Sequence, residues 1–102
     1  MAIIIRTDGS SEIIFNPTFE QLRKAVGGDI EYVPFKRYNL ALKHLEAEVN
    51  RVADCMYCHG EGYLIGLEYN ERATELIGYD VVGNVVVLFD TLCGSVSPHF
   101  PQ

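Results

Sequence analysis

The feature that most constrains the fold is an apolar run near the C-terminal end of the chain. Residues Val81 to Phe89 read VVGNVVVLF, in which only Gly83 and Asn84 interrupt the apolar side chains. A strand with one solvent-exposed face alternates apolar and polar residues, whereas a continuous apolar run is typical of a strand that is buried on both faces. We therefore expect this segment to be the central strand of a sheet.

Three further strands are predicted by isoleucine-rich or alternating segments. Ala2 to Arg6 and Glu12 to Phe15 flank the turn residues Asp8 to Ser11, which predicts an N-terminal hairpin. Asp29 to Phe35 alternates in polarity and predicts a third strand. Pro34 restricts that strand to an edge of the sheet or to an end position.

Two segments predict longer helices. Phe19 to Val26 follows Thr18, which can form a capping box with Gln21, and Gly27 ends the helix. Tyr38 to Val52 carries apolar residues at intervals of three and four, which is typical of an amphipathic helix.

The remaining elements complete the expected fold. Tyr63 to Leu67 predicts one more short strand, and Glu71 to Ile77 predicts a short helix with Asn70 as its N-cap and Gly78 as its stop. Together the elements predict an α+β domain with a small, mostly antiparallel sheet and two or three helices packed on one face.

The composition is that of one ordinary globular domain. The chain has 102 residues, 48% of them apolar, and a formal net charge of −6, which disfavours direct binding to nucleic acid or to a membrane surface. We expect residues 1–102 to form a single domain, with 37–54 an inserted amphipathic helix and 91–102 an irregular tail. Without a signal sequence or a membrane-spanning stretch, the expected location is the cytoplasm.

The run CMYCHGEG, from Cys55 to Gly62, matches two cofactor motifs. Its first five residues match Cys-x-x-Cys-His, the attachment motif of a c-type haem. All eight match Cys-x-x-Cys-x-Gly-x-Gly, the zinc repeat of a chaperone zinc domain. Haem attachment would also need a second axial ligand and an export route, which the sequence does not supply. The cysteines have the spacing of a zinc chelate, which Cys93 with His59 or His99 could complete. We expect no cofactor and read the cysteines as partly buried apolar residues. The alternative is a zinc-stabilised structural or regulatory module with ligands Cys55, Cys58, His59 and Cys93.

The sequence predicts no catalytic constellation. Cys55 and Cys58 follow a helix, at the negative end of its dipole, which argues against a reactive thiolate. His44, His59 and His99 fall in a helix, a glycine turn and the tail, and no spacing brings them to a nucleophile. We therefore expect the protein not to be an enzyme.

Three short patterns carry a family resemblance. Val-Gly-Gly-x-Ile-Glu occupies residues 26–31, Asn-x-x-Ala-Thr occupies 70–74, and Val-Gly-Asn-Val-Val-Val occupies 82–87. In this order they resemble a family of small proteins of unknown function carried by bacteriophages and other mobile elements. The chain departs from the family pattern at His59-Gly60, at Leu67-Glu68 and in the inserted helix. The resemblance implies that CMYCHGEG is a variant of the family's Asn-Glu-x-Gly strand-to-strand turn and that its cysteines are incidental.

The resemblance implies a biological setting rather than a chemistry. We expect a non-enzymatic accessory protein that acts by binding in the host cell and inhibits a defence system by capturing a protein component or a nucleotide signal. The candidate ligand site is Tyr69, Asn70 and Arg72, where a ring, an amide and a guanidinium lie near a helix start that suits anions. The alternative is a capping Asn70 beside a solvated Arg72.

The isoleucine-rich hairpin predicts self-association. An exposed apolar edge invites strand addition, and a symmetric dimer is the commonest result. We expect a homodimer that Ile4→Lys dissociates. The alternative is that the helix predicted from Tyr38 to Val52 covers the excess apolar surface within one chain.

Overall fold

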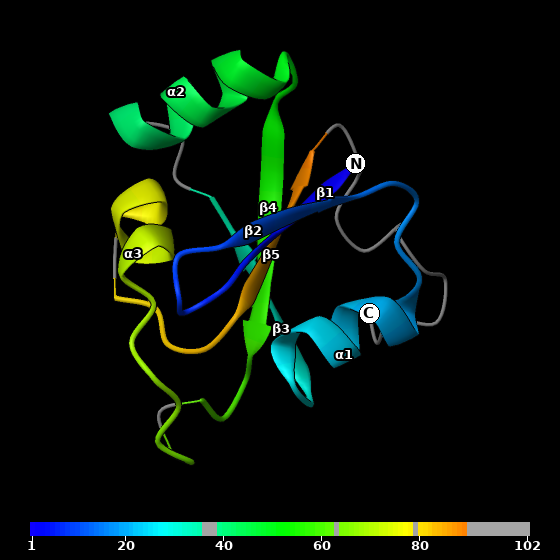
Figure 1. The fold of residues 1–102 in the computed structure, drawn as a ribbon, viewed down its shortest axis with the longest axis vertical. Coiled ribbons are helices and arrows are strands. Elements are labelled where there is room, and N and C mark those ends of the chain that lie inside the picture. Colours follow the sequence, from blue (N-terminus) through cyan, green and yellow to red (C-terminus); the bar gives the residue numbers. More distant parts are fainter. Residues whose placement is uncertain (36–38, 63, 79, 90–102) are drawn as a thin grey trace.

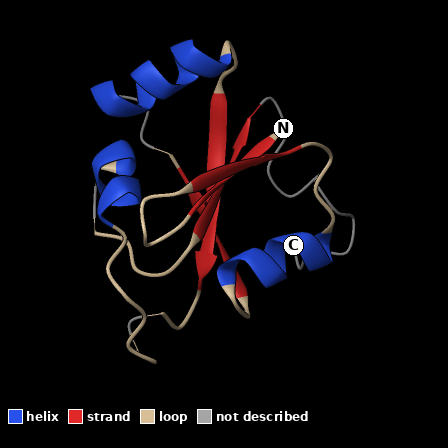
Figure 2. Ribbon diagram, viewed as in Figure 1, coloured by secondary structure: helices blue, strands red, loops and turns tan. Residues whose placement is uncertain are grey.

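The computed structural model describes residues 1–35, 39–62, 64–78 and 80–89. They form an antiparallel sheet flanked by helices, which confirms the α+β class (Figure 1). The strands are β1 (Ala2–Ile5), β2 (Ser11–Ile14), β3 (Ile30–Pro34), β4 (Ala53–His59) and β5 (Val85–Phe89). The helices are α1 (Phe19–Val26), α2 (Leu40–Val49) and α3 (Glu71–Ile77) (Figure 2).

β5 is the central strand, as its apolar run predicts. The sheet order is β2-β1-β5-β4-β3, and every neighbouring pair is antiparallel. Val85, Val87 and Phe89 belong to one core, while Val86 and Leu88 belong to a second core on the other face. This alternation is the one that a strand imposes, so both faces of β5 are packed.

The helices differ in one respect from the expected arrangement, because they cover both faces of the sheet. α2 and α3 pack together on the face that carries Phe89, whereas α1 packs on the opposite face through Leu22 and Val26 (Figure 1). The reason lies in β5, since a strand that is apolar on both sides requires cover on both sides. α1 also connects the two edge strands, β2 and β3, and so spans the face that α2 and α3 leave open.

The predicted ends of α1 and α3 are confirmed in detail. Thr18 and Gln21 form a capping box at the start of α1, and Gly27 ends that helix in the left-handed conformation. Asn70 caps α3, and Gly78 ends it in the same way as Gly27 ends α1. These signals are local, so the sequence suffices to predict them.

α2 is shorter than its predicted range. Asn39 caps it and Asn50 ends it in the left-handed conformation. Ala53 and Asp54, the last residues of the predicted 37–54 insert, belong to strand β4. The expected irregular tail, 91–102, lies outside the described residues.

The strand predicted after the cysteine run is displaced. Cys55 to His59 form most of β4, so the interpretation of CMYCHGEG as a turn is wrong for its first five residues. The described residues of the predicted strand at Tyr63 to Leu67 lie in turns instead. β4 pairs with β3 on one side and with β5 on the other, and Cys55, Met56 and Tyr57 are buried in that enclosed position.

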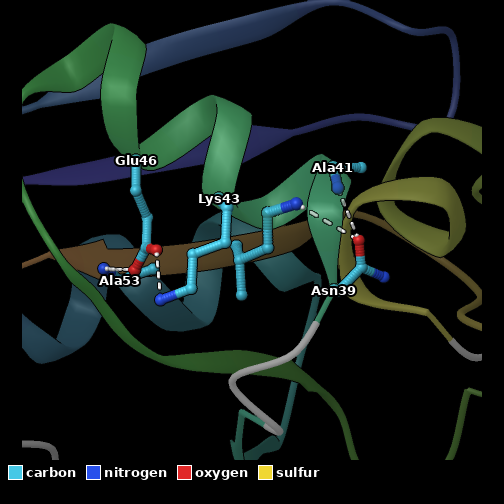
Figure 3. Close-up of polar contacts among 6 residues, drawn as sticks. Asn39, Ala41, Lys43, Glu46 and Ala53 are labelled. Atoms are coloured by element: carbon cyan, nitrogen blue, oxygen red, sulfur yellow. Dashed lines mark hydrogen bonds and ion pairs between the residues drawn. The ribbon is translucent and has the colours of Figure 1, made fainter.

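A buried carboxylate fixes the connection between α2 and β4. Glu46 is only 9% exposed, and its Oε2 accepts a hydrogen bond of 2.7 Å from the backbone N–H of Ala53 (Figure 3). The other carboxylate oxygen lies 3.2 Å from Nζ of Lys43. Glu46 therefore holds the start of β4 beneath the helix that precedes it.

Candidate functional site

The predicted ligand residues lie at the start of α3, but Asn70 is fully buried. Its Oδ1 accepts a hydrogen bond of 3.0 Å from the N–H of Ala73, which is the helix cap. Its Nδ2 donates to the carbonyl oxygen of Ile5 at 3.0 Å and to that of Gly83 at 2.9 Å. Both donors and the capping acceptor are thus used within the protein, so Asn70 supports the fold rather than presenting an amide to a ligand.

Arg72 and Tyr69 are exposed, whereas Asn70 is buried, so the three side chains do not form one ligand site. Nη1 of Arg72 donates to the carbonyl oxygen of Gly9 at 3.0 Å, and it lies 3.4 Å from Oγ of Ser11. Tyr69 is 48% exposed, and its backbone forms an isolated bridge with Val82. The guanidinium therefore ties α3 to the hairpin turn.

The hollow beside Arg72 has a negative character. It encloses about 290 Å³ and is lined by Thr7, Asp8, Gly9, Glu71, Arg72 and Glu75. Three carboxylates surround one guanidinium, so the phosphates of a nucleotide would meet more repulsion than attraction there. This geometry gives no support to the nucleotide alternative.

The two cysteines of the predicted zinc chelate lie in an extended strand, where residues three apart point to opposite faces. Cys55 is fully buried in the core under α1, while Cys58 packs against the core under α2 and α3. Cys55 is disulfide-bonded, and Cys58 is a free thiol. Burial, together with the nearby charge of Glu31, raises the pKa of Cys58 to about 11, which keeps it a neutral thiol at ordinary pH.

His59 has an internal role at the end of β4. Its Nδ1 accepts a hydrogen bond of 3.0 Å from the N–H of Glu61. Its ring lies so close to Gly28 that a Cβ at that glycine would be 2.6 Å from Nε2. The other proposed ligands, Cys93 and His99, lie outside the described residues. Within the described part of the chain, no three His, Cys, Asp or Glu side chains gather as a metal site would require.

A turn between β4 and α3 carries apolar side chains that no sequence motif marks. This 61–68 turn, of which residues 61, 62 and 64–68 are described, has a closely packed base. A Cβ at Gly62 would lie 2.8 Å from Cγ2 of Val82, and one at Gly83 would lie 2.8 Å from Cδ1 of Leu67. Such close approach requires glycine at both positions, so the base of the turn has little room to move.

Backbone hydrogen bonds close the same turn. The N–H of Leu67 donates to the carbonyl oxygen of Gly62 at 3.0 Å, and that of Ile65 donates to Glu61 at 3.1 Å. On the far side, the N–H of Gly83 donates to Glu68 at 2.7 Å. These hydrogen bonds, between described residues, fix the base of the turn.

The tip of this turn presents Leu64, which is 85% exposed, and Ile65, which is 56% exposed. Glu61 and Glu68, on either side, are exposed as well. Figure 1 shows the turn projecting beyond the end of β4. One sequence signal could have identified it, because two adjacent branched apolar residues between Gly62 and Gly66 have too little chain to fold back into a core.

Comparisons of the chain with protein-family models, with curated proteins and with solved structures give no match. Among the residues that the structure describes, no helix combines the length and the apolar character needed to cross a membrane.

Proposed function

We propose that the protein is a non-enzymatic accessory protein of a bacteriophage or other mobile element and acts in the host cytoplasm by binding a host protein. The observation that carries the binding is the exposed pair Leu64 and Ile65 on a turn whose base is fixed. The setting rests on the family resemblance of residues 26–31, 70–74 and 82–87. In that setting, inhibition of a defence system by capture of one component is the proposed activity.

Two physical properties favour a protein over a small molecule as the partner. A turn whose backbone is fixed at its base before binding loses less conformational entropy on association, so its exposed apolar side chains are efficient anchors for a pocket on another protein. In contrast, the one place where the sequence predicts a nucleotide site combines Arg72 with Asp8, Glu71 and Glu75.

The charges around the turn define the chemistry of the partner. Glu61 and Glu68 flank the apolar tip, and the whole chain carries a formal net charge of −6. A complementary surface has an apolar pocket for Leu64 with lysine or arginine side chains at its rim. Proteins that bind nucleic acid commonly carry basic surfaces of this kind.

The test is a binding measurement with a matched control. The tagged protein is used to capture a partner from bacteria that carry a defence system, and the captured protein is then purified. Its affinity is measured for the wild type, for Leu64→Asp and for Leu40→Asp, because Leu40 at the start of α2 is also 85% exposed. A plaque assay with a phage that is sensitive to the defence system gives the biological readout.

We expect Leu64→Asp to weaken the purified complex by about 30-fold or more, as loss of an interface anchor of about 2 kcal/mol does. Leu40→Asp should change the affinity less than about twofold, because that side chain lies elsewhere. Equal effects of the two substitutions would refute the role of the turn. Failure to obtain a stoichiometric partner, together with no rescue of the phage, would refute the proposed function.

We also propose that the protein is a homodimer. The hairpin remains the candidate interface, but Ile4 is only 6% exposed and belongs to the core under α1. Ile4→Lys would place a charge in that core and unfold the chain, so it cannot report on dimerisation. The exposed part of the hairpin is strand β2.

A further inference from the structure

Among the described residues, no strand lies beside the outer edge of β2, which carries a row of backbone hydrogen-bonding groups. β2 is the first strand of the sheet order, and β1 is its neighbour in the described chain. β2 pairs with β1 in the register Ile3 to Ile13 and Ile4 to Glu12. In an antiparallel pair, alternate residues exchange hydrogen bonds with the neighbour, and the residues between them direct their N–H and C=O groups to the other side.

Two hydrogen bonds fix which residues of β2 face outward. The N–H of Arg6 donates to Ser10 at 2.9 Å, and the N–H of Phe89 donates to Met1 at 2.9 Å. Even-numbered residues of β1 therefore bond with β2, and odd-numbered ones bond with β5. It follows that Glu12 and Ile14 bond inward to β1, while the backbones of Ser11 and Ile13 point to the free edge. Continued one residue past the end of β2, the same alternation gives Phe15 an outward backbone.

The side chains on the same edge are apolar and exposed. Ile13 is 52% exposed and Phe15 is 70% exposed. Both lie on the face of Ile3, because Ile13 pairs with Ile3 and side chains alternate along a strand. The only charge in β2 is Glu12, which forms an ion pair with Arg6 of the same chain.

We propose that two copies of the protein pair through β2, antiparallel, about a twofold axis that passes beside Ile13. In this register Ile13 of one copy lies opposite Ile13 of the other, and Ser11 lies opposite Phe15. All the outward backbone groups of these three residues then find partners in the second copy. This inference gives an atomic register to the proposed homodimer and rests on that proposal.

The second copy is the occupant that this edge fits, because the pairing is self-complementary. Glu12 of one copy lies opposite Ile14 of the other, so the two acidic side chains do not face each other. Ile13 meets its own counterpart, and Phe15 lies diagonal to it on the same face, which covers the exposed apolar surface. The other edge strand, β3, contains Glu31 and ends at Pro34, two features that oppose strand addition.

Pairing through β2 would also affect the proposed binding function. It would place two 61–68 turns in one particle, and a bivalent particle binds a multimeric partner more tightly than one turn does. Partner binding and dimerisation can be tested separately, because Leu64 lies in the turn after β4 and Ile13 lies in the hairpin.

Self-association is tested first by light scattering at high micromolar concentration. We expect the wild type to approach the mass of a dimer, and Ile13→Lys to weaken association at least tenfold. Leu40→Lys is the control, and it should leave the mass unchanged. Thermal unfolding of each variant shows whether it is folded, and a wild type that stays monomeric overturns the proposal.

The register is tested by cysteine cross-linking in the background Cys58→Ser, which removes the free thiol. Ile13→Cys alone should form a covalent dimer, because Cα atoms of a hydrogen-bonded pair are about 5.5 Å apart, within the range of a disulfide. Ser11→Cys and Phe15→Cys should cross-link with each other when mixed and not with themselves. Cross-linking of Ile13→Cys no faster than that of Leu40→Cys would overturn the register. A wild type that stays monomeric but still captures its partner through Leu64 would overturn this inference and leave the proposed binding function standing.

Discussion

The starts of α3 and α2 are both capped by an asparagine, and the two residues differ in what surrounds them. Oδ1 of Asn70 accepts one hydrogen bond at the start of α3, and Oδ1 of Asn39 accepts from Ala41 and Leu42 at the start of α2 (Figure 3). Asn70 is fully buried, and its amide bonds to β1 and to the turn at Gly83. Asn39 is partly exposed, and its amide makes one long contact of 3.5 Å with Glu75.

The difference shows that a capping residue has no fixed energetic value. A cap in contact with water can exchange its hydrogen bonds for solvent ones, so its loss costs little. A buried cap that also satisfies distant carbonyl groups leaves those groups unpaired when it is removed, and water cannot reach them. Asn70 therefore joins β1, α3 and the turn at Gly83, whereas Asn39 joins two neighbouring helices.

The largest expected effect is that of Asn70→Ala, which should lower the free energy of unfolding by about 3 kcal/mol. Two buried carbonyl groups, of Ile5 and Gly83, would lose their donor, and each such loss costs about 1–3 kcal/mol before relaxation. Urea unfolding followed by circular dichroism measures the change.

A second substitution at the same position separates the two roles of Asn70. Asn70→Asp keeps the oxygen that caps α3 but replaces the two amide donors with an acceptor that faces two carbonyl groups. If Asn70 acted as a cap alone, aspartate would be tolerated, because it caps helices as well as asparagine does. We expect Asn70→Asp to destabilise at least as much as Asn70→Ala, and a neutral result would contradict the structure.

The same two asparagines show what a sequence can reveal about a site. The Asn70 cap is recognisable because its signal lies within a few residues of the helix start, whereas the helix predicted from Tyr38 to Val52 placed Asn39 inside it. The partners of the Asn70 amide lie 65 and 13 residues away, so no local pattern indicates them. That is why Asn70 could be mistaken for a ligand-binding residue. The apolar tip of the 61–68 turn was missed because Tyr63 to Leu67 was predicted to be a strand.

In the fold, too, the features set by local signals were predictable, and those set by distant contacts were not. The central position of β5 follows from its apolar run, and the hairpin, α1 and α3 follow from local turn and cap signals. The placement of α1 across the opposite face depends on the order of the strands, which the sequence does not state. β4 was missed for a related reason, because CMYCH contains no period that distinguishes a strand from a turn.

The next effect concerns the contact between the two helices near Asn39. Gly78 has a φ of 95°, and a Cβ there would lie 2.6 Å from Nδ2 of Asn39. Gly78→Ala should cost about 1.5 kcal/mol, from the left-handed backbone and from the displacement of that amide. In a double-mutant cycle with Asn39→Ala, the combined cost should be less than the sum, because the clash disappears. Strict additivity would show that the two residues do not touch.

Asn39→Ala itself should lower the free energy of unfolding by about 1 kcal/mol, the usual value for loss of an N-cap. Its oxygen serves two backbone N–H groups that water can reach when the side chain is absent. Asn39→Asp is the matched control and should be neutral or slightly stabilising, because an acidic cap favours the helix dipole. The two caps are compared most directly by the same substitution: aspartate should be tolerated at position 39 and should destabilise the protein at position 70. A loss at Asn39 as large as that at Asn70 would contradict the role assigned to burial.

The smallest effect is expected at Asp8, where the same kind of side-chain cap is fully exposed in the hairpin turn. Its Oδ1 accepts a hydrogen bond of 2.8 Å from the N–H of Ser10. Hydrogen bonds from the side chain and the backbone of Ser10 hold the pKa of Asp8 below its usual value, and the charge of Arg6 adds a smaller effect. Because the folded pKa lies below the unfolded one, the stabilisation is complete above the unfolded pKa of about 4 and is lost as the pH falls through the folded pKa.

Asp8→Asn keeps the acceptor but removes the charge, so it isolates this contribution. The urea midpoint of the wild type should exceed that of Asp8→Asn slightly at pH 7, and the difference should shrink towards pH 3. Ser10→Ala removes the side-chain donor to Asp8. The urea midpoint of this variant should therefore depend less on pH than that of the wild type. A difference that stays constant with pH, or that grows in acid, would show that the turn does not prefer the charged form of Asp8. The order Asn70, Asn39 and Asp8 would then no longer follow the burial of the capping side chain at its exposed end.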